Sequence, residues 1–167
     1  SLLEPGKKKG NVVNFLGFFS PLVDDCEIYD LLHSAGVKTI HEISRCKDYM
    51  EYQTMSEANF NLVLHHEARF AAEDFHNRLQ IPFIELRRLY QMDKIENQYH
   101  ALGNALGVTF HDEKYKKQAE DTLEKFRQKC PDASFAIGEC LNADPFELSL
   151  ALIRYGFSVP EIYGTIT

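Results

Sequence analysis

Residues 59–86 constrain the fold more than any other part of the chain. A short apolar run at 60–64 precedes a segment with helical spacing, and a second apolar run follows at 81–86, with Pro82 near its start. In the middle segment apolar residues recur every three or four positions, at Ala68, Ala71, Ala72, Phe75 and Leu79. A helix that joins two short buried strands predicts a βαβ unit with parallel strands and a right-handed crossover.

The same alternation continues along the chain. Strands are predicted at 11–17, 37–43, 60–65 and 81–86, and helices at 26–34, 46–58, 67–79 and 91–106. The fold class is therefore α/β, a Rossmann- or flavodoxin-like parallel sheet with helices on both faces. Because such doubly wound domains often take the strand order 2-1-3-4, we expect the first and third strands to be neighbours.

The chain is predicted to divide into three parts. Residues 1–110 form the α/β domain with its four-stranded sheet, residues 111–131 a charged connecting helix, and residues 132–167 the start of a second, truncated α/β domain. Within 112–129 the apolar positions are few, so this helix is expected to be largely solvated: Tyr115, Ala119, Leu123 and Phe126. The last part carries a strand at 134–138, a helix at 146–155 and a strand at 159–166.

Charge and cysteine spacing exclude several classes of protein. The net charge is −7 and no dense basic patch occurs, which argues against nucleic-acid binding. No stretch is apolar enough to span a membrane. The four cysteines are widely spaced and form no CxxC pair, so we expect reduced thiols and a cytoplasmic protein. The chain opens at Ser1 without an initiator Met, which indicates part of a longer protein.

The carboxyl ends of parallel strands are where ligands bind in such folds. The loops after the first and third strands therefore define a candidate ligand crevice. The N-terminus of the helix that starts near Glu67, which carries a partial positive charge, is expected to point at this crevice. No glycine-rich phosphate motif follows Gly17, so dinucleotide binding is disfavoured. Catalytic residues are not identified by any motif. The candidate crevice residues are the following: Phe18, Ser20, His65, His66 and Arg69.

Each of these residues has two interpretations. The histidine pair could donate hydrogen bonds, move protons or hold a metal, or it could simply cap the turn. No metal site is predicted, because no acidic partner or third ligand stands at metal spacing. Arg69 could bind an anion, or it could pair with Glu73 four residues further on. Glu85 could face the crevice or the surface.

Several short segments occur together in a familiar order. They are VVNFLG at 12–17, IYDLL at 28–32 followed by AGV at 35–37, ANFNLV at 58–63, and QIPFIE at 80–85. Residues 135–138 and 148–156 continue the series. In this order and spacing the chain resembles the middle of a nitrogenase component 1 type subunit, a family that includes molybdenum–iron protein chains and their cofactor-assembly relatives.

This resemblance implies a set of properties for the full-length protein. The family stacks several α/β domains around iron–sulfur clusters, pairs with a homologous sister subunit and accepts electrons from an ATP-dependent iron protein. In its catalytic members a cysteine follows the Leu-Val strand, whereas Leu64-His65 stands at that place here. The other cluster cysteines of the family lie before Ser1. No cluster is therefore expected in this piece, no ligand role passes to Cys26, Cys46, Cys130 or Cys140, and the isolated piece is expected to be inactive.

Two alternatives to a substrate-reducing subunit stay open at this point. One is an iron–sulfur cofactor-assembly scaffold of the same family. The other is a flavodoxin-like module that binds a small ligand at the same crevice.

Overall fold

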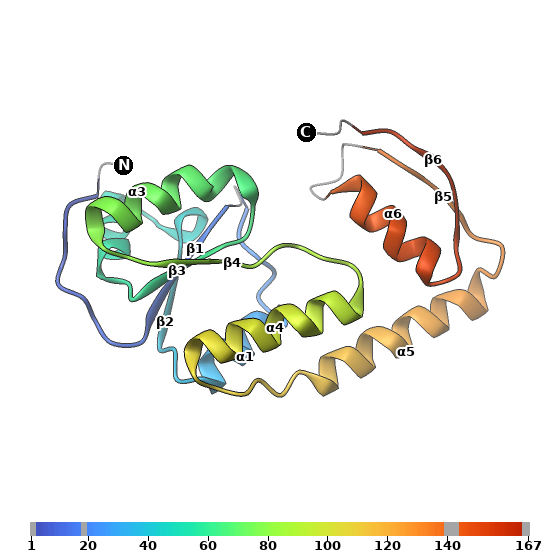
Figure 1. Ribbon diagram of the computed structural model, residues 1–167, viewed down its shortest axis with the longest axis horizontal. Coiled ribbons are helices and arrows are strands. Elements are labelled where there is room, and N and C mark those ends of the chain that lie inside the picture. Colours follow the sequence, from blue (N-terminus) through green and yellow to red (C-terminus); the bar gives the residue numbers. More distant parts are fainter. Residues whose placement is uncertain (1–2, 18–19, 139–143, 165–167) are drawn as a thin grey trace. The chain divides into compact units, whose positions relative to one another are not determined.

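The computed structural model describes residues 3–17, 20–138 and 144–164 (Figure 1). The chain forms two compact units. The first comprises Ser1–Arg87 and Leu102–Phe110, and the second comprises Arg88–Ala101 and His111–Thr167. Each unit has its own sheet. The three-part domain division stated above stays a prediction.

The first unit is built on a four-stranded parallel sheet. Its strands are β1 (Val12–Leu16), β2 (Thr39–Glu42), β3 (Phe60–Val63) and β4 (Phe83–Glu85), in the order β2-β1-β3-β4. All pairs are parallel, and Asn14 of β1 lies opposite Asn61 of β3. The predicted α/β class and strand order are confirmed, with β1 and β3 adjacent. The strands are two or three residues shorter than their predicted ranges.

Helices cover both faces of this sheet (Figure 1). Every residue of β1 is buried, as a strand covered on both sides requires. On one face Val12 and Val63 share a core cluster with Phe75 and Leu79 of α3 (Arg69–Leu79). On the other face the ring of Phe15 meets Tyr29 of α1 (Glu27–Ser34), with centroids 5.7 Å apart.

The single helix predicted at 46–58 is wrong in extent. The segment instead contains the short helix α2 (Tyr49–Gln53), with the 3-10 turn η1 (Ile43–Arg45) before it and η2 (Thr54–Glu57) after it. Asp48 begins α2 by accepting the Glu51 N–H at 2.8 Å. The hydroxyls of Thr54 and Ser56 donate to carbonyls three residues back, at 2.6 and 2.8 Å, and so compete with a continuing helix.

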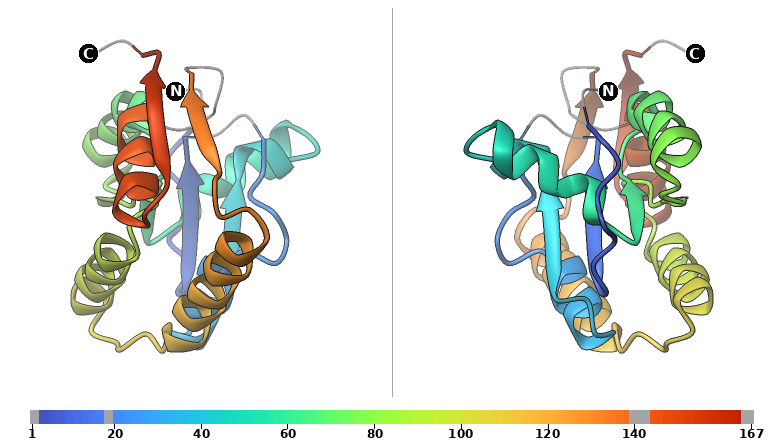
Figure 2. Two further views of the ribbon diagram at one scale, coloured as in Figure 1. Left: turned by 90° about the vertical axis from the view of Figure 1, so that its right-hand side faces the viewer. Right: turned by 90° about the vertical axis from the view of Figure 1, so that its left-hand side faces the viewer.

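The second unit has a sheet of two strands, whereas the sheet of the first unit has four, and polar side chains join its helices. It holds the first part of α4 (Met92–Leu106), α5 (Glu113–Lys129), β5 (Ser134–Ile137), α6 (Pro145–Arg154) and β6 (Ser158–Ile162). β5 and β6 run parallel, side by side (Figure 2). None of the residues of α5 is buried, which confirms that this helix is largely solvated. The last strand ends at Ile162, earlier than predicted.

Two polar side chains tie α4 and α6 together within this unit. The nearly buried carboxylate of Glu147 accepts hydrogen bonds from Gln91 Nε2 at 2.7 Å and from Lys94 Nζ at 2.9 Å. The Tyr155 hydroxyl accepts the Met92 N–H and donates to the Tyr90 carbonyl, both at 2.8 Å. The first turn of α4 is thereby anchored by side chains rather than by apolar burial. Across the described residues, no helix is long and apolar enough to cross a membrane.

Candidate functional site

The ends of β1 and β3 are closed tightly against each other. The Leu64 N–H donates to the Leu16 carbonyl at 2.8 Å. Gly17 then turns with φ of 134°, and a Cβ at this position would lie 2.6 Å from the His65 backbone nitrogen. Only glycine therefore fits at the end of β1 without displacing the turn that carries the histidine pair.

His65 and His66 lie side by side at the carboxyl end of β3. The chain forms the 3-10 turn η3 (His66–Ala68) before α3 begins, so the helix starts at Arg69 rather than at residue 67. The two imidazole centroids are 4.3 Å apart. His65 Nδ1 accepts the Glu67 N–H at 3.4 Å, which is the capping contact that one interpretation predicted.

Glu67 is the residue that sequence reasoning missed here. Its carboxylate oxygen lies 3.7 Å from His65 Nδ1, and the turn places one donor atom from each of His65, His66 and Glu67 within 4.8 Å of one another. The expectation of no metal site rested on the lack of a third ligand, and this turn supplies one. The signal in the sequence is the contiguous His-His-Glu, of which the spacing pattern assigns only Glu67 to the helix at 67–79.

Arg69 makes the ion pair that its second interpretation predicted. Its Nε lies 3.1 Å from Glu73 Oε1, and its terminal nitrogen lies 3.4 Å from Glu85 Oε1. Glu85 also pairs with Arg87 at 3.3 Å. Glu73 and Glu85 at this edge of the sheet are thus paired with guanidinium groups, and Glu67 adds a third carboxylate.

Ser20 lines a small hollow whose lining does not include His65, His66 or Arg69. The hollow has a volume of about 10 Å³, room for one water molecule at most. Its other lining residues are Phe15, Leu16, Gly17, Glu42, Ile43, Ser44 and Leu64. Phe18 lies outside the described residues. The structure therefore brings His65, His66 and Arg69 onto one turn and places Ser20 beside β1 and β2.

A polar network at the end of β2 holds the loop that follows β1. The buried carboxylate of Glu42 accepts the Leu22 N–H at 3.2 Å, the Arg45 Nε–H at 3.1 Å and the Tyr29 hydroxyl. Burial and the bond to Glu42 raise the pKa of Tyr29 to about 12. Sequence reasoning did not identify this network, because its partners are separated by up to 20 residues.

The described thiols do not fit an iron–sulfur cluster. Cys26 and Cys46 are half-buried and Cys130 is exposed, and all three are free. Burial raises the pKa of the Cys26 and Cys46 thiols, and acidic neighbours such as Glu27 and Glu51 raise them further. Iron binds the thiolate, which this environment disfavours. In the ranges that the structure covers, the one close group of three metal-ligating side chains is His65, His66 and Glu67.

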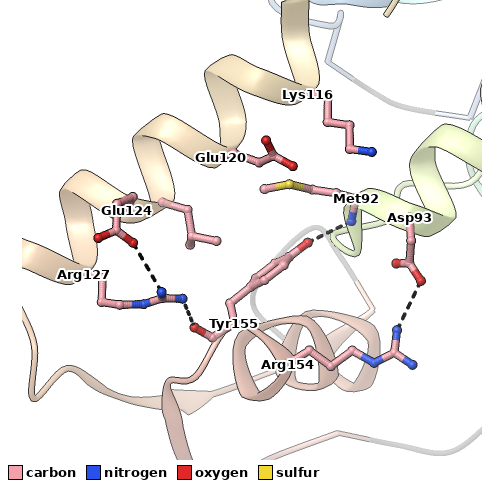
Figure 3. Close-up of a pocket in the computed structure, with 9 residues that line it drawn as sticks. Met92, Asp93, Lys116, Glu120, Glu124, Arg127, Arg154 and Tyr155 are labelled. Carbon is pink, nitrogen blue, oxygen red and sulfur yellow. Dashed lines mark hydrogen bonds and ion pairs between the residues drawn. The ribbon is translucent and has the colours of Figure 1, made fainter. Parts of the chain in front are cut away.

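The second unit has a larger, open groove of about 470 Å³, which the sequence had not indicated (Figure 3). Its charged groups are engaged with one another: Arg127 pairs with Glu124 at 3.3 Å, and Arg154 with Asp93 at 3.5 Å. Arg127 also donates to the Tyr155 carbonyl. Because these cations are already neutralised by carboxylates, the groove offers weak attraction to a charged ligand. The full lining is Met92, Asp93, Lys116, Glu120, Leu123, Glu124, Arg127, Arg154 and Tyr155.

One family model and several solved structures match this chain. The model of the nitrogenase component 1 type oxidoreductases matches residues 1–143. Among solved structures, nitrogenase Cp1 at pH 6.5 aligns over 99% of this chain with a TM-score of 0.69 and 20% identity. Nitrogenase Cp1 at pH 5 aligns over 97%, with a TM-score of 0.59 and 18% identity. The chain spans only 41% and 35% of those two proteins. A comparison with curated proteins gave no match.

Proposed function

The chain belongs to the nitrogenase component 1 type oxidoreductase family, and we propose that it is part of a subunit that accepts electrons and reduces a substrate. The family match over residues 1–143 carries this proposal. The β2-β1-β3-β4 sheet, whose fold is that of nitrogenase Cp1, supports it. The proposal concerns the full-length protein, because this chain spans less than half of the structural relatives.

Within the full-length protein the described residues have a structural role. They supply a rigid sheet, and the carboxyl ends of its strands are the usual edge for ligands. An iron–sulfur cluster would store and pass electrons when bound, and its thiolate ligands would come from other parts of the protein, because Cys26 and Cys46 do not fit that role. The proposed partners are a sister subunit and an ATP-dependent iron-protein reductase, in the cytoplasm.

The crevice at the ends of β1 and β3 is proposed as the place where this chain faces its ligand. His65, His66 and Arg69 are the residues assigned to it, whereas Ser20 lines the separate hollow beside β1 and β2 and Phe18 lies outside the described residues. The exposure of the histidine turn supports this assignment, since His66 and Glu67 are exposed and His65 is only half-buried. No catalytic step is assigned to any of these residues.

One observation favours a second candidate, an iron–sulfur cofactor-assembly scaffold of the same family. Leu64-His65 occupies the place where the resemblance implies a cluster-binding cysteine in catalytic members. A subunit without that ligand would hold a cofactor less tightly and could release it. The scaffold and the reductase share one fold, so only their turnover distinguishes them.

The test uses the full-length protein with its sister subunit and an iron-protein reductase. A reducing subunit gives sustained, ATP-dependent electron uptake, measured as dihydrogen evolution because protons need no identified substrate. A scaffold gives at most one round of cofactor transfer. We expect sustained uptake, lowered by His65→Ala, His66→Ala and Arg69→Ala but not by His111→Ala, an exposed control. Absence of ATP-dependent electron uptake from every preparation contradicts the proposal.

A further inference from the structure

The turn after β3 gathers three donor atoms of the kind that bind transition metals. His65, His66 and Glu67 each offer one atom, and the three atoms lie within 4.8 Å of one another. They are consecutive in the chain, and η3 turns them to the same side. No residue between the ligands therefore has to be ordered when an ion binds.

One distance in the group is close to that of a formed site. Metal–nitrogen and metal–oxygen bonds of about 2.0–2.2 Å, at angles of 90–110°, place two ligand atoms about 3.0–3.4 Å apart. His65 Nδ1 and the Glu67 carboxylate oxygen are 3.7 Å apart, and an ion bound at Nδ1 would replace its 3.4 Å contact with the Glu67 N–H. A small rotation of the Glu67 side chain closes this gap, and that side chain is 69% exposed and so has room to turn.

The charge around the turn favours a cation. Arg69, two residues after Glu67, is directed to Glu73 and Glu85. The second guanidinium, that of Arg87, also contacts Glu85. These guanidinium groups are paired with Glu73 and Glu85, and the turn itself carries the carboxylate of Glu67, so an arriving divalent ion meets a negative group there.

We propose that His65, His66 and Glu67 form a binding site for a single divalent transition-metal ion, such as Zn²⁺ or Fe²⁺. Two imidazoles and a carboxylate suit these ions, whereas Mg²⁺ and Ca²⁺ prefer oxygen ligands alone. Three protein ligands leave coordination positions open for water or a further ligand. The site contains no thiolate and is distinct from an iron–sulfur cluster. It rests on local geometry and does not depend on the proposed function.

The test is equilibrium dialysis of the full-length protein against Zn²⁺ under anaerobic conditions, with bound metal counted by atomic emission. We expect His65→Ala, His66→Ala and Glu67→Gln each to lower the affinity for one zinc per chain by more than about tenfold. His111→Ala and Glu113→Gln, which change exposed residues of the same types, leave zinc binding unchanged. Circular dichroism confirms that each variant is folded.

The identity of the ligands is checked independently by zinc X-ray absorption. The difference between wild type and His65→Ala is expected to contain nitrogen and oxygen scatterers with the imidazole pattern. A sulfur shell in that difference overturns the assignment. Zinc binding that is equal in the wild type and all three ligand variants, or lost equally in the two controls, overturns the site itself.

Discussion

The two units of the chain are stabilised in different ways. In the first, α3 buries Ala72, Phe75 and Leu79 against a sheet that is covered on both faces. In the second, α5 buries none of its residues, and a glutamine, Gln91, is among the most deeply buried side chains. The second unit adds a trio of aromatic rings, those of Phe126, Phe135 and Phe157, with centroids 5.6–6.2 Å apart.

The contrast follows from the sheets. A parallel sheet with helices on both faces can bury long apolar runs, so burial supplies most of its stability. A two-stranded sheet offers little surface to cover, and its helices depend more on hydrogen bonds and ion pairs. Such contacts are directional and titratable, so the second unit is expected to respond to pH and the first to loss of apolar volume.

The largest effect is expected from Leu79→Ala in α3. Leu79 is 4% exposed, and truncation leaves a cavity in the core cluster, so the free energy of unfolding of the first unit falls by about 3 kcal/mol. Hydrogen exchange of the α3 and β3 amides measures the loss. The matched control is Leu150→Ala in α6, where the side chain is 43% exposed and the cost stays below about 1 kcal/mol. Equal losses of unfolding free energy in the two variants would contradict the proposed difference between the two units.

The next effect is expected from Glu147→Gln in the second unit. The variant loses the ion pair with Lys94 and charge-assisted hydrogen bonds, which costs about 1.5 kcal/mol at neutral pH, measured by hydrogen exchange in α6. Burial alone would raise the pKa of Glu147. The bonds from Lys94, the Tyr90 N–H and Gln91 outweigh burial and hold this pKa below its usual value of 4.5.

The sign of the pH dependence follows from that lowered pKa. Because the unfolded chain takes up the proton first, the stabilisation by Glu147 is present above pH 4.5 and is lost as the pH falls through the lower pKa of the folded state. Stability of α6 measured between pH 6 and pH 3 should therefore fall more steeply in the wild type than in Glu147→Gln. The exposed substitution Glu120→Gln should follow the wild type. Parallel curves for all three proteins would contradict the role of Glu147.

A smaller effect is expected from Leu123→Ala in α5. The sequence placed Leu123 on the packing stripe of this helix, and a fully buried leucine there would cost about 2–4 kcal/mol on truncation. Leu123 is only half-buried, so the expected loss is about 1 kcal/mol in urea unfolding. A loss near 3 kcal/mol would mean that α5 is packed as closely as α3.

The smallest effect is a gain, expected from Gln80→Gly at the end of α3. Gln80 adopts φ of 56°, a left-handed conformation that glycine takes without strain. The substitution should raise the free energy of unfolding of the first unit by about 0.5–1 kcal/mol. Gln80→Ala is the control: it removes the side-chain bond to the Asn77 carbonyl but keeps the Cβ, so no gain is expected.

The fold was predictable where apolar periodicity is strong. Four apolar runs separated by helices predicted the α/β class, and the strand order usual in doubly wound domains predicted that β1 and β3 are neighbours, as they are. The segment at 46–58 was not predictable from periodicity, because the hydroxyls of Thr54 and Ser56 bond to the backbone and interrupt the helix. Such contacts depend on the rotamer of a single side chain, which spacing does not encode.

The position of the site in the fold was predictable from the sequence, but the contacts between its side chains were not all predictable. Strand-end reasoning located His65, His66 and Arg69, and the pairing of Arg69 with Glu73 is a local contact at helical spacing. The contact between Arg69 and Glu85 requires the register of β3 and β4. The bond between Gln91 and Glu147 joins residues 56 positions apart. Neither contact has a signature in one sequence.

The absence of a side chain at Gly17 has a consequence for any ion or molecule that His65 receives. The backbone of His65 packs against Gly17, and the preceding residue, Leu64, is hydrogen-bonded to Leu16. The His65 backbone therefore has little room to move. A ligand therefore restricts only side-chain rotation, and little backbone entropy is lost on binding. Replacing Gly17 by alanine would displace this frame, slow the encounter with the ligand and shorten its residence time, even though residue 17 contributes no ligand atom.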